Sequence, residues 1–302
     1  MDVGGTKIKA SIISSAGDIL GDIMVFDSKS KESKDNIINN FIFIMNELVT
    51  KNNMNAIKLS GIGMAFPGPF DYEKGISYIK GLNKYEHIYG INLKEELKQA
   101  IEKDIELKNN FERDFSLAFS NDGDLFSLGE YLKGYAKDSI RAICICIGTG
   151  VGSSFLERGR LIKEAANVPK EGWIYHTAYK EGIVDDYISA RGILGISKNV
   201  ESLKDIKEVR ELYDLAMAGN YEAKKVFGEF GKRLREVMIP FFDKFKPDTF
   251  VIGGQISKSF IFFGEEISKE CEDRKINLYI SKDTSASTLK GVAMIFGGEA
   301  CR

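Results

Sequence analysis

Three glycine-rich turns, each placed next to a short strand-like segment, restrict this chain more than any other feature of its sequence. The first turn opens the chain, the second follows the apolar run from Arg141 to Ile147, and the third follows Phe250 to Ile252. Glycine at a strand end lets backbone N–H groups turn toward a ligand without a Cβ in the way. Each turn is therefore either a tight structural turn or part of a site for an anionic group.

The first turn combines its glycines with a hydroxyl, a cation and a carboxylate. Its residues are Asp2, Val3, Gly4, Gly5, Thr6 and Lys7. Thr6 and Lys7 are suited to a phosphate, and Asp2 is suited to holding Mg²⁺ through water, because Mg²⁺ on nucleotides keeps several waters and takes one or two carboxylates. A plain hairpin is the alternative. An apolar strand normally precedes such a turn, which leaves open whether the true start lies upstream of Met1.

The second and third turns follow strands of the second half. The second contains Gly148, Thr149, Gly150, Val151 and Gly152. Three glycines in five residues are costly to keep ordered, which favours a phosphate cradle over a mere tight turn. In the third turn, Gly253 and Gly254 allow close approach of a nucleotide base or ribose, and a strand-to-helix turn is the alternative.

Strand and helix patterns alternate along the chain. Hydrophobic periodicity predicts strands near 8–12, 19–26, 57–66, 141–147 and 250–252, and helices near 33–52, 93–101, 125–131 and 221–245. The alternation predicts an α/β architecture, with the apolar runs as central strands covered on both faces. After the turn at Pro67, Gly68 and Pro69, the irregular stretch from Phe70 to Gly90 is a candidate binding loop.

Composition indicates an ordinary globular protein. The 302 residues carry 42 basic and 44 acidic side chains, so nothing suggests a nucleic-acid partner. No window approaches the roughly 18 apolar residues of a membrane span, and no secretory leader pattern opens the chain, so we expect no membrane association and a cytoplasmic location. The four cysteines form no disulfide-like framework and read as reduced, structural thiols: Cys144, Cys146, Cys271 and Cys301.

A polar cluster around Asp122 is the candidate catalytic centre. Asn121 and Asp122 stand just before an apolar, helix-like stretch, so either residue could serve only as a helix cap. In phosphoryl transfer, however, a carboxylate accepts the proton of the attacking hydroxyl while Mg²⁺ and backbone donors neutralise the phosphate charge. With the glycine turns present, we interpret Asp122 as that general base.

Taken in their order along the chain, the glycine turns and the Asn121 and Asp122 pair resemble the motifs of the ROK (repressor, open reading frame, kinase) sugar kinases of the hexokinase–actin–Hsp70 superfamily. The turn at 2–7 resembles phosphate motif one, 148–152 phosphate motif two and 251–254 the adenosine motif. The resemblance implies a two-lobed, actin-like ATPase (ribonuclease H-like) α/β fold with a central cleft. It implies one lobe at 1–120, to which 285–302 returns, a second lobe at 121–284, and ATP with Mg²⁺ as cofactors.

On the sugar side the chain departs from the family pattern. The resemblance implies sugar ligands at Gly68, Asn83, Asn121, Asp122, Glu171, His176 and Asp185. Trp173, however, stands where the family carries a glutamate, and Glu171 could replace it only if the loop runs differently. The family's zinc motif needs closely spaced cysteines, and this chain has none between Cys146 and Cys271, so we expect no structural zinc. His176 is then a sugar ligand or a core histidine.

The function implied by the resemblance is ATP-dependent phosphorylation of a glucose-like hexose at its 6-hydroxyl. Kinases of N-acylhexosamines (N-acetylmannosamine or N-acetylglucosamine), fructose, mannose or β-glucosides stay open. Two other classes are a non-catalytic sugar-sensing regulator and a chaperone- or filament-type ATPase. A homodimer is implied by the resemblance alone.

Overall fold

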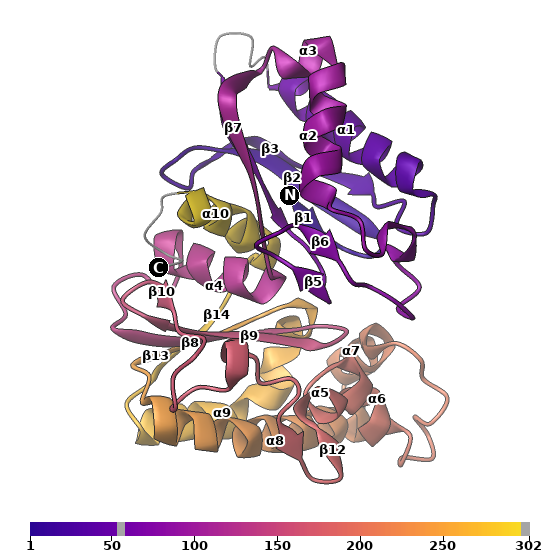
Figure 1. Cartoon of the computed structure of the whole chain (residues 1–302). Coiled ribbons are helices and arrows are strands. Elements are labelled where there is room, and N and C mark those ends of the chain that lie inside the picture. The colour runs from indigo at the N-terminus through magenta and orange to yellow at the C-terminus, as the bar shows by residue number, and fades with distance from the viewer. Residues whose placement is uncertain (53–57, 297–302) are drawn as a thin grey trace. The chain divides into compact units, whose positions relative to one another are not determined.

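The computed structural model describes residues 1–52 and 58–296, and the chain divides into two compact units (Figure 1). Within the described residues, unit 1 comprises 1–52, 58–133 and 285–296, and unit 2 comprises Gly134–Thr284. This division differs from the expected boundary at 120/121 by one helix, α4 (Asp122–Lys133), which belongs to unit 1. Residues 297–302, which we assigned to the returning segment, and Cys301 lie outside the described residues.

Unit 1 is built on a five-stranded sheet of order β3-β2-β1-β4-β7. The strands are β1 (Asp2–Val3), β2 (Lys7–Ile13), β3 (Ile19–Asp27), β4 (Leu59–Ala65) and β7 (Phe111–Ser120). β1, β2 and β3 are joined antiparallel, whereas β4 runs parallel to both β1 and β7. The predicted hairpin at 8–26 is confirmed. The start of the strand predicted at 57–66 lies outside the described residues at Ile57.

Helices cover both faces of this sheet. α1 (Lys34–Lys51) and α2 (Leu93–Lys103) pack on one face in the same core, followed by the short α3 (Ile105–Lys108). α1 begins where the Ser33 hydroxyl accepts from the Asn36 N–H, which is helix capping by a side chain. α10 (Thr284–Phe296) packs on the other face, against β4. The helices predicted at 33–52 and 93–101 are confirmed.

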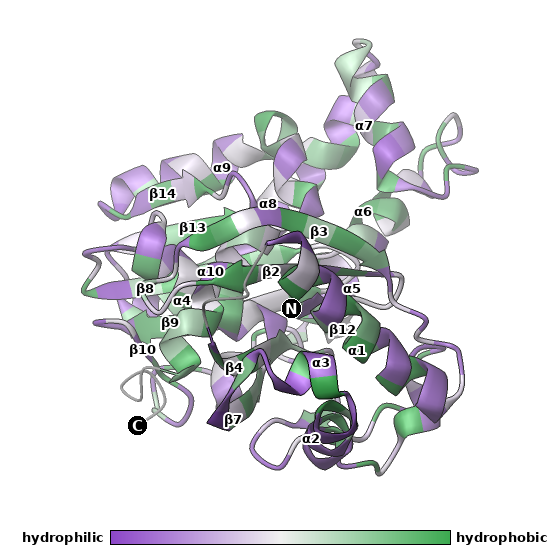
Figure 2. Cartoon of the chain, turned by 90° about the horizontal axis from the view of Figure 1, so that it is seen from above, coloured by the Kyte–Doolittle hydropathy of each residue, from purple (hydrophilic) through white to green (hydrophobic). Residues whose placement is uncertain are grey.

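Unit 2 contains a second five-stranded sheet, of order β10-β9-β8-β13-β14. The strands are β8 (Arg141–Ile147), β9 (Val151–Glu157), β10 (Arg160–Leu161), β13 (Thr249–Gly253) and β14 (Asn277–Ile280). β13 pairs parallel with both β8 and β14, as expected for apolar central strands. Figure 2 shows β13 as one of the hydrophobic strands.

The helices of unit 2 pack around the long helix α8 (Tyr221–Phe245), whose bounds match the predicted helix. The others are α5 (Val184–Tyr187), α6 (Ala190–Ser197), α7 (Val209–Met217) and α9 (Phe260–Asp273). α8 and α9 bury aromatic side chains against the sheet; Phe230 and Phe263, for example, meet edge to face at 5.2 Å. Cys144 and Cys271 are buried, as expected for structural thiols.

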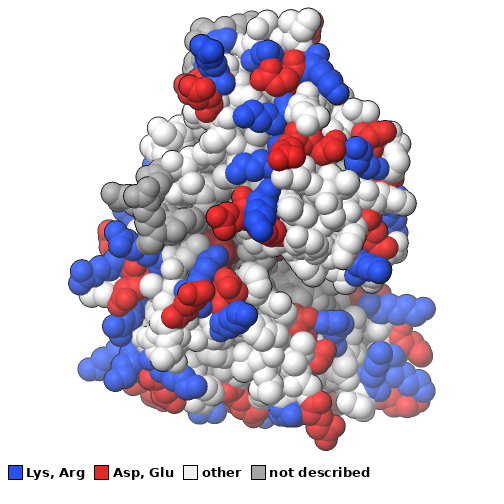
Figure 3. Space-filling model, in the orientation of Figure 1, with Lys and Arg blue, Asp and Glu red and all other residues white. Residues whose placement is uncertain are grey.

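The stretch 70–90 is more ordered than expected. It contains a small hairpin, β5 (Phe70–Asp71) and β6 (Ile76–Ser77), and a 3₁₀ turn, η2 (Glu86–Ile88). Ile79 and Tyr85 have no exposed surface and fix the loop in the core of unit 1. Basic and acidic side chains are interspersed over the face drawn in Figure 3, as the near-neutral composition predicts. No described helix is long and apolar enough to cross a membrane.

Candidate active site

In unit 1 the predicted site residues converge because three parallel strands end at one edge of the sheet. Asp2 of β1 pairs with Ala65 of β4, and Ala65 pairs with Ser120 of β7. The residues that follow these strands therefore meet at the shared carboxyl edge, where parallel α/β sheets commonly bind ligands. This edge carries the first glycine turn, the loop at Gly68 and the pair Asn121 and Asp122.

The first glycine turn is held through its carbonyl groups. The Gly4 N–H donates to the Lys7 carbonyl at 3.0 Å, and the Gly4 carbonyl accepts from the Tyr85 hydroxyl at 3.1 Å. The Gly5 carbonyl accepts from the hydroxyls of Ser28 at 2.7 Å and Ser30 at 2.5 Å. Side chains from two other loops therefore fix the turn from behind.

Two lysines lie at this turn, one in an exposed ion pair and the other packed against a glycine. Lys7 donates to the Asp27 carboxylate at 2.5 Å, and both side chains are more than half exposed, so the pair is a weak surface contact. Lys84 lies across the turn, since its Cδ is 3.0 Å from where a Cβ on Gly5 would stand. Sequence reasoning missed Lys84, whose only signal was its place next to the predicted sugar ligand Asn83.

Asp122 is the first residue of α4, and its surroundings disfavour the ionised form of its carboxyl. Desolvation by surrounding protein is the largest cause that raises the pKa of its carboxyl, followed by repulsion from the Asp2 carboxylate. The Gly123 N–H donates to it at 2.9 Å, and Lys84 also lowers its pKa, but neither offsets the rise. Asp122 keeps some exposed surface. Repulsion by the Asp2 carboxylate raises the pKa in the same direction as desolvation, so burial is not the only cause of the raised pKa.

Asn121 performs the capping that sequence reasoning also considered for Asp122. Its Oδ1 accepts from the Gly123 N–H at 2.9 Å, and its carbonyl accepts from the Leu125 N–H at 3.1 Å. Its Nδ2 donates to the Tyr72 hydroxyl at 3.4 Å, and that hydroxyl lies 3.4 Å from where a Cβ on Gly68 would stand. Asn121 and Gly68 are therefore neighbours through Tyr72.

Asn83 lies on the exposed part of its loop. It has a left-handed backbone conformation, with φ of 55°, and its N–H donates to the Glu86 carboxylate at 2.7 Å. The asparagine tolerates this conformation better than most residues do. The contact fixes the loop between Gly81 and η2 and leaves the Asn83 side chain at the surface.

In unit 2 the second and third glycine turns lie side by side. The second joins β8 to β9 and is closed by the Gly148 N–H donating to the Gly150 carbonyl at 2.8 Å. Gly254 follows β13 with φ of +90°, and a Cβ there would lie 2.2 Å from the Ile147 carbonyl oxygen. Only glycine permits this approach, which brings the ends of β8 and β13 together.

Asp185 is joined directly to the second glycine turn. Its Oδ1 accepts from the Val151 N–H at 2.7 Å, and its Oδ2 pairs with the Arg191 guanidinium. The carboxylate is 15% exposed, and a Cβ on Gly150 would lie 2.8 Å from its Oδ1. Asp185 thus holds the turn in place, a contact that sequence reasoning did not foresee.

The segment 171–176 is fixed by a buried serine of β9. The Ser153 hydroxyl donates to the Gly172 carbonyl at 2.8 Å and accepts from the Ile174 N–H at 2.8 Å. The Asp185 N–H donates to the Tyr175 carbonyl at 3.0 Å, so the exposed His176 lies beside Asp185. Glu171 lies at the other end, where its N–H bonds to the Lys163 carbonyl at 2.9 Å.

Each unit therefore brings together part of the predicted site. Unit 1 gathers Asp2, the first glycine turn, Asn121 and Asp122, and unit 2 gathers two glycine turns with Asp185. Within 1–52 and 58–296, no group of three His, Cys, Asp or Glu side chains has an arrangement that could hold a metal ion.

The comparisons with known proteins agree on one family. The sequence model of the ROK family matches residues 1–285. The glucokinase of Halalkalibacterium halodurans is 23% identical over 282 residues, which cover 86% of this chain and 80% of that protein.

Two solved structures share the fold. A ROK family glucokinase from Streptomyces griseus, in complex with glucose and AMPPNP, matches with a TM-score of 0.73 and 18% identity over 97% of each chain. A ROK family transcriptional regulator, a homologue of the E. coli MLC protein, matches with a TM-score of 0.77 and 17% identity over 98% of this chain and 76% of that one.

Proposed function

This chain belongs to the ROK family. We propose that it is an ATP-dependent kinase that phosphorylates a glucose-like hexose at its 6-hydroxyl. The observation that carries the proposal is the position of Asp122. Its carboxylate follows β7 at the same sheet edge as Asp2 and the first glycine turn, close enough to Asp2 for the two charges to repel. A proton acceptor next to a phosphate-binding turn is what hydroxyl phosphorylation needs.

The glycine turns fit a nucleotide. A Cβ on Gly148 would meet no atom within 4 Å, so packing within the protein does not require glycine there. Close approach of phosphate oxygens to the bare backbone gives a reason for it. Asp2 and the exposed Thr6 offer oxygen ligands of the kind that Mg²⁺ prefers. When bound, MgATP supplies the transferable phosphoryl group and a cation that neutralises its charge.

Asp122 acts as the general base in this proposal. It accepts the proton of the sugar hydroxyl as that oxygen attacks, and a raised pKa makes it a stronger base than an ordinary aspartate. Lys84, which lies across Gly5, contributes positive charge at the phosphate turn. Asn121 fixes the start of α4 and so orients Asp122.

Three residues are proposed to bind sugar hydroxyls. His176, Asn83 and Asn121 bind sugar hydroxyls, and Glu171 lies on the same segment as His176. The contacts of Asp185 support a positioning role, because one carboxylate oxygen already holds the Val151 N–H and the other pairs with Arg191. It then links the sugar-binding segment to the phosphate turn.

The test is a coupled assay of ATP consumption over a panel of glucose, mannose, fructose, N-acetylmannosamine, N-acetylglucosamine and a β-glucoside. We expect glucose to stimulate ATP consumption most strongly and to yield the 6-phosphate by phosphorus NMR. Preference for an N-acylhexosamine would keep the kinase and change its substrate. Sugar binding by calorimetry without ATP consumption for any sugar would instead indicate a sensor and overturn the proposal.

A further inference from the structure

A short hairpin separates the proposed sugar ligand His176 from Asp185. Its strands are β11 (Ala178–Tyr179) and β12 (Gly182–Ile183), which pair antiparallel. The Val184 N–H extends the pairing toward the open end of the hairpin by donating to the Thr177 carbonyl at 2.9 Å. His176 and Asp185 therefore follow directly on opposite arms of one hairpin, and the place of both depends on where the hairpin lies.

The hairpin is too short to fix its own position. Each strand contributes only two residues to the ladder. A small two-stranded hairpin is marginally stable unless it packs against other elements. Its position therefore depends on the side chains that join it to the helices of unit 2.

Tyr179 joins the hairpin to the long helix α8. Its hydroxyl donates to a carboxylate oxygen of Glu236 at 2.5 Å, a length typical of a charge-assisted bond. The Lys180 ammonium lies 3.8 Å from the same oxygen and 5.2 Å from the centre of the Tyr179 ring. Desolvation, followed by the bond to Glu236, raises the pKa of the Tyr179 hydroxyl, so the donor keeps its proton at neutral pH.

Aromatic packing joins the same tyrosine to α5. The rings of Tyr179 and Tyr187 meet edge to face at 5.0 Å, and the Arg233 guanidinium of α8 lies 5.6 Å from the centre of the Tyr187 ring. Tyr187 ends α5, two residues after Asp185. Tyr179 thus contacts both α8 and the helix that carries Asp185.

We propose that Tyr179 is a positioning residue for the sugar-binding segment: its bond to Glu236 anchors the hairpin on α8 and so holds His176 beside Asp185 for the sugar. This inference rests on the proposed function, in which His176 binds a sugar hydroxyl. Glu236 is 52% exposed, so the bond adds little to the stability of the whole unit. Its loss is felt first at the hairpin.

The test is Tyr179→Phe, which keeps the ring and removes the hydroxyl. We expect the KM for glucose to rise roughly three- to tenfold, the range of one lost hydrogen bond, because the arms of the hairpin lose their anchor. The turnover number and the KM for ATP should stay within about twofold of the wild-type values, because the phosphate turns and Asp122 are untouched.

A second readout needs no activity. Trp173 is the only tryptophan of the chain, its indole nitrogen is buried, and it stands three residues before His176 in the segment 171–176. We expect its fluorescence emission to move to longer wavelength in Tyr179→Phe, because a loosened hairpin lets water reach the indole.

Variants of the two partners and of a second tyrosine serve as controls. Glu236→Gln keeps an acceptor for the Tyr179 hydroxyl and should keep the wild-type KM and emission. Glu236→Leu should match Tyr179→Phe, and the double variant should be no worse than either single change, because both remove the same bond. Tyr221→Phe makes the same chemical change at the exposed first residue of α8 and should change neither readout.

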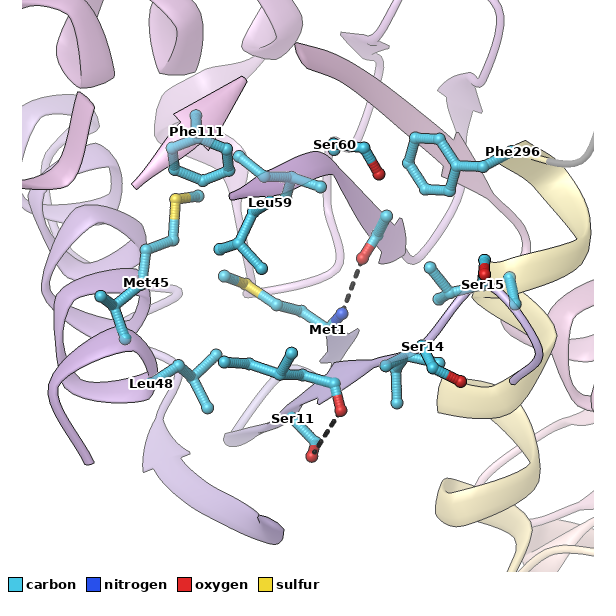
Figure 4. A pocket seen from close by; sticks show the side chains of 18 residues that line it. Met1, Ser11, Ser14, Ser15, Met45, Leu48, Leu59, Ser60, Phe111 and Phe296 are labelled. Atoms are coloured by element: carbon cyan, nitrogen blue, oxygen red, sulfur yellow. Dashed lines mark hydrogen bonds between the residues drawn. The ribbon is translucent and has the colours of Figure 1, made fainter. Parts of the chain in front are cut away.

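Leu48→Ala controls for a general loss of stability. Leu48 is a buried residue of α1 in unit 1, where it lines an apolar cavity of about 320 Å³ beside Met1 (Figure 4). Truncating a buried leucine enlarges the empty space and should lower Tm. It should leave the KM for glucose and the Trp173 emission unchanged.

An unchanged KM for glucose in Tyr179→Phe would overturn the proposal, whether or not the emission moves. So would an equal rise in KM in Leu48→Ala, which would trace the effect to stability alone. Failure of the wild-type protein to consume ATP with any sugar would count against the proposed function instead. The Trp173 emission, with sugar affinity by calorimetry in place of KM, then decides the role of Tyr179.

Discussion

The side chain of Lys84 lies across Gly5, with its Cδ 3.0 Å from the position that a Cβ on Gly5 would take. The same lysine lowers the pKa of Asp122, against the larger effects of desolvation and Asp2. One cation from the loop after Leu82 thus acts on both the first glycine turn and the proposed base. The following predictions start from this relationship.

Replacing Lys84 by methionine should move the acid limb of the kcat/KM profile to higher pH. The lysine favours the ionised carboxylate of Asp122, so its loss raises the pKa of the base further. Lys84→Arg keeps the charge and should retain the wild-type limb. An unchanged limb in Lys84→Met would show that the titrating base is another group.

Asp122→Asn should lower kcat by roughly two to four powers of ten while sugar and nucleotide affinity change little. The folded state raises the pKa of Asp122, so the ionised carboxylate destabilises the fold as pH rises through that pKa. The variant should therefore melt at or above the wild-type temperature at pH 7. Near-wild-type turnover by a folded variant would remove Asp122 from the mechanism.

Asp185→Ala should raise the KM for ATP at least tenfold, because it frees the Val151 N–H and loosens the second glycine turn. Asp185→Asn retains an acceptor for the Val151 N–H and should raise the KM for ATP less than Asp185→Ala does. Arg191→Ala breaks only the ion pair, and Arg191 is 61% exposed, so its effect on ATP should be small. If Arg191→Ala and Asp185→Ala had equal effects on KM, the contact with Val151 would not be the cause.

Gly129→Ala should destabilise unit 1 by roughly 2 kcal/mol or more, because the added Cβ would lie 1.8 Å from the Ser287 carbonyl oxygen and force α4 and α10 apart. Gly228→Ala is the matched control. A Cβ on Gly228 meets no atom within 4 Å in α8, so this change should stabilise the helix by about 0.5–1 kcal/mol. Denaturant unfolding of both variants measures the difference. Equal stabilities would contradict the close helix contact.

Activity should require Mg²⁺ and no zinc, because phosphate oxygens need a hard cation and the chain has no cysteine between Cys146 and Cys271 to form the family's zinc motif. Strong chelation should abolish activity, and added Mg²⁺ alone should restore it. Metal analysis of the purified protein checks the second half of this prediction. One zinc per chain that survives chelation would contradict it.

The sequence by itself determined the alternation of strands and helices, the bounds of β8 and α8, and the three glycine turns. These follow from local patterns, since strand and helix periods and glycine at strand ends are written in neighbouring residues. The nomination of Asp122 also came from sequence, as a carboxylate between a strand and a helix. Its role stays a prediction.

Only the tertiary structure placed Lys84 over Gly5 and the Asp185 carboxylate on the Val151 N–H. It also assigned α4 to unit 1, where Gly129 packs against Ser287 of α10. These contacts join residues from about 35 to 160 positions apart in the chain. No local pattern encodes such pairs, because they depend on which strand edges and helix faces meet after the chain has folded.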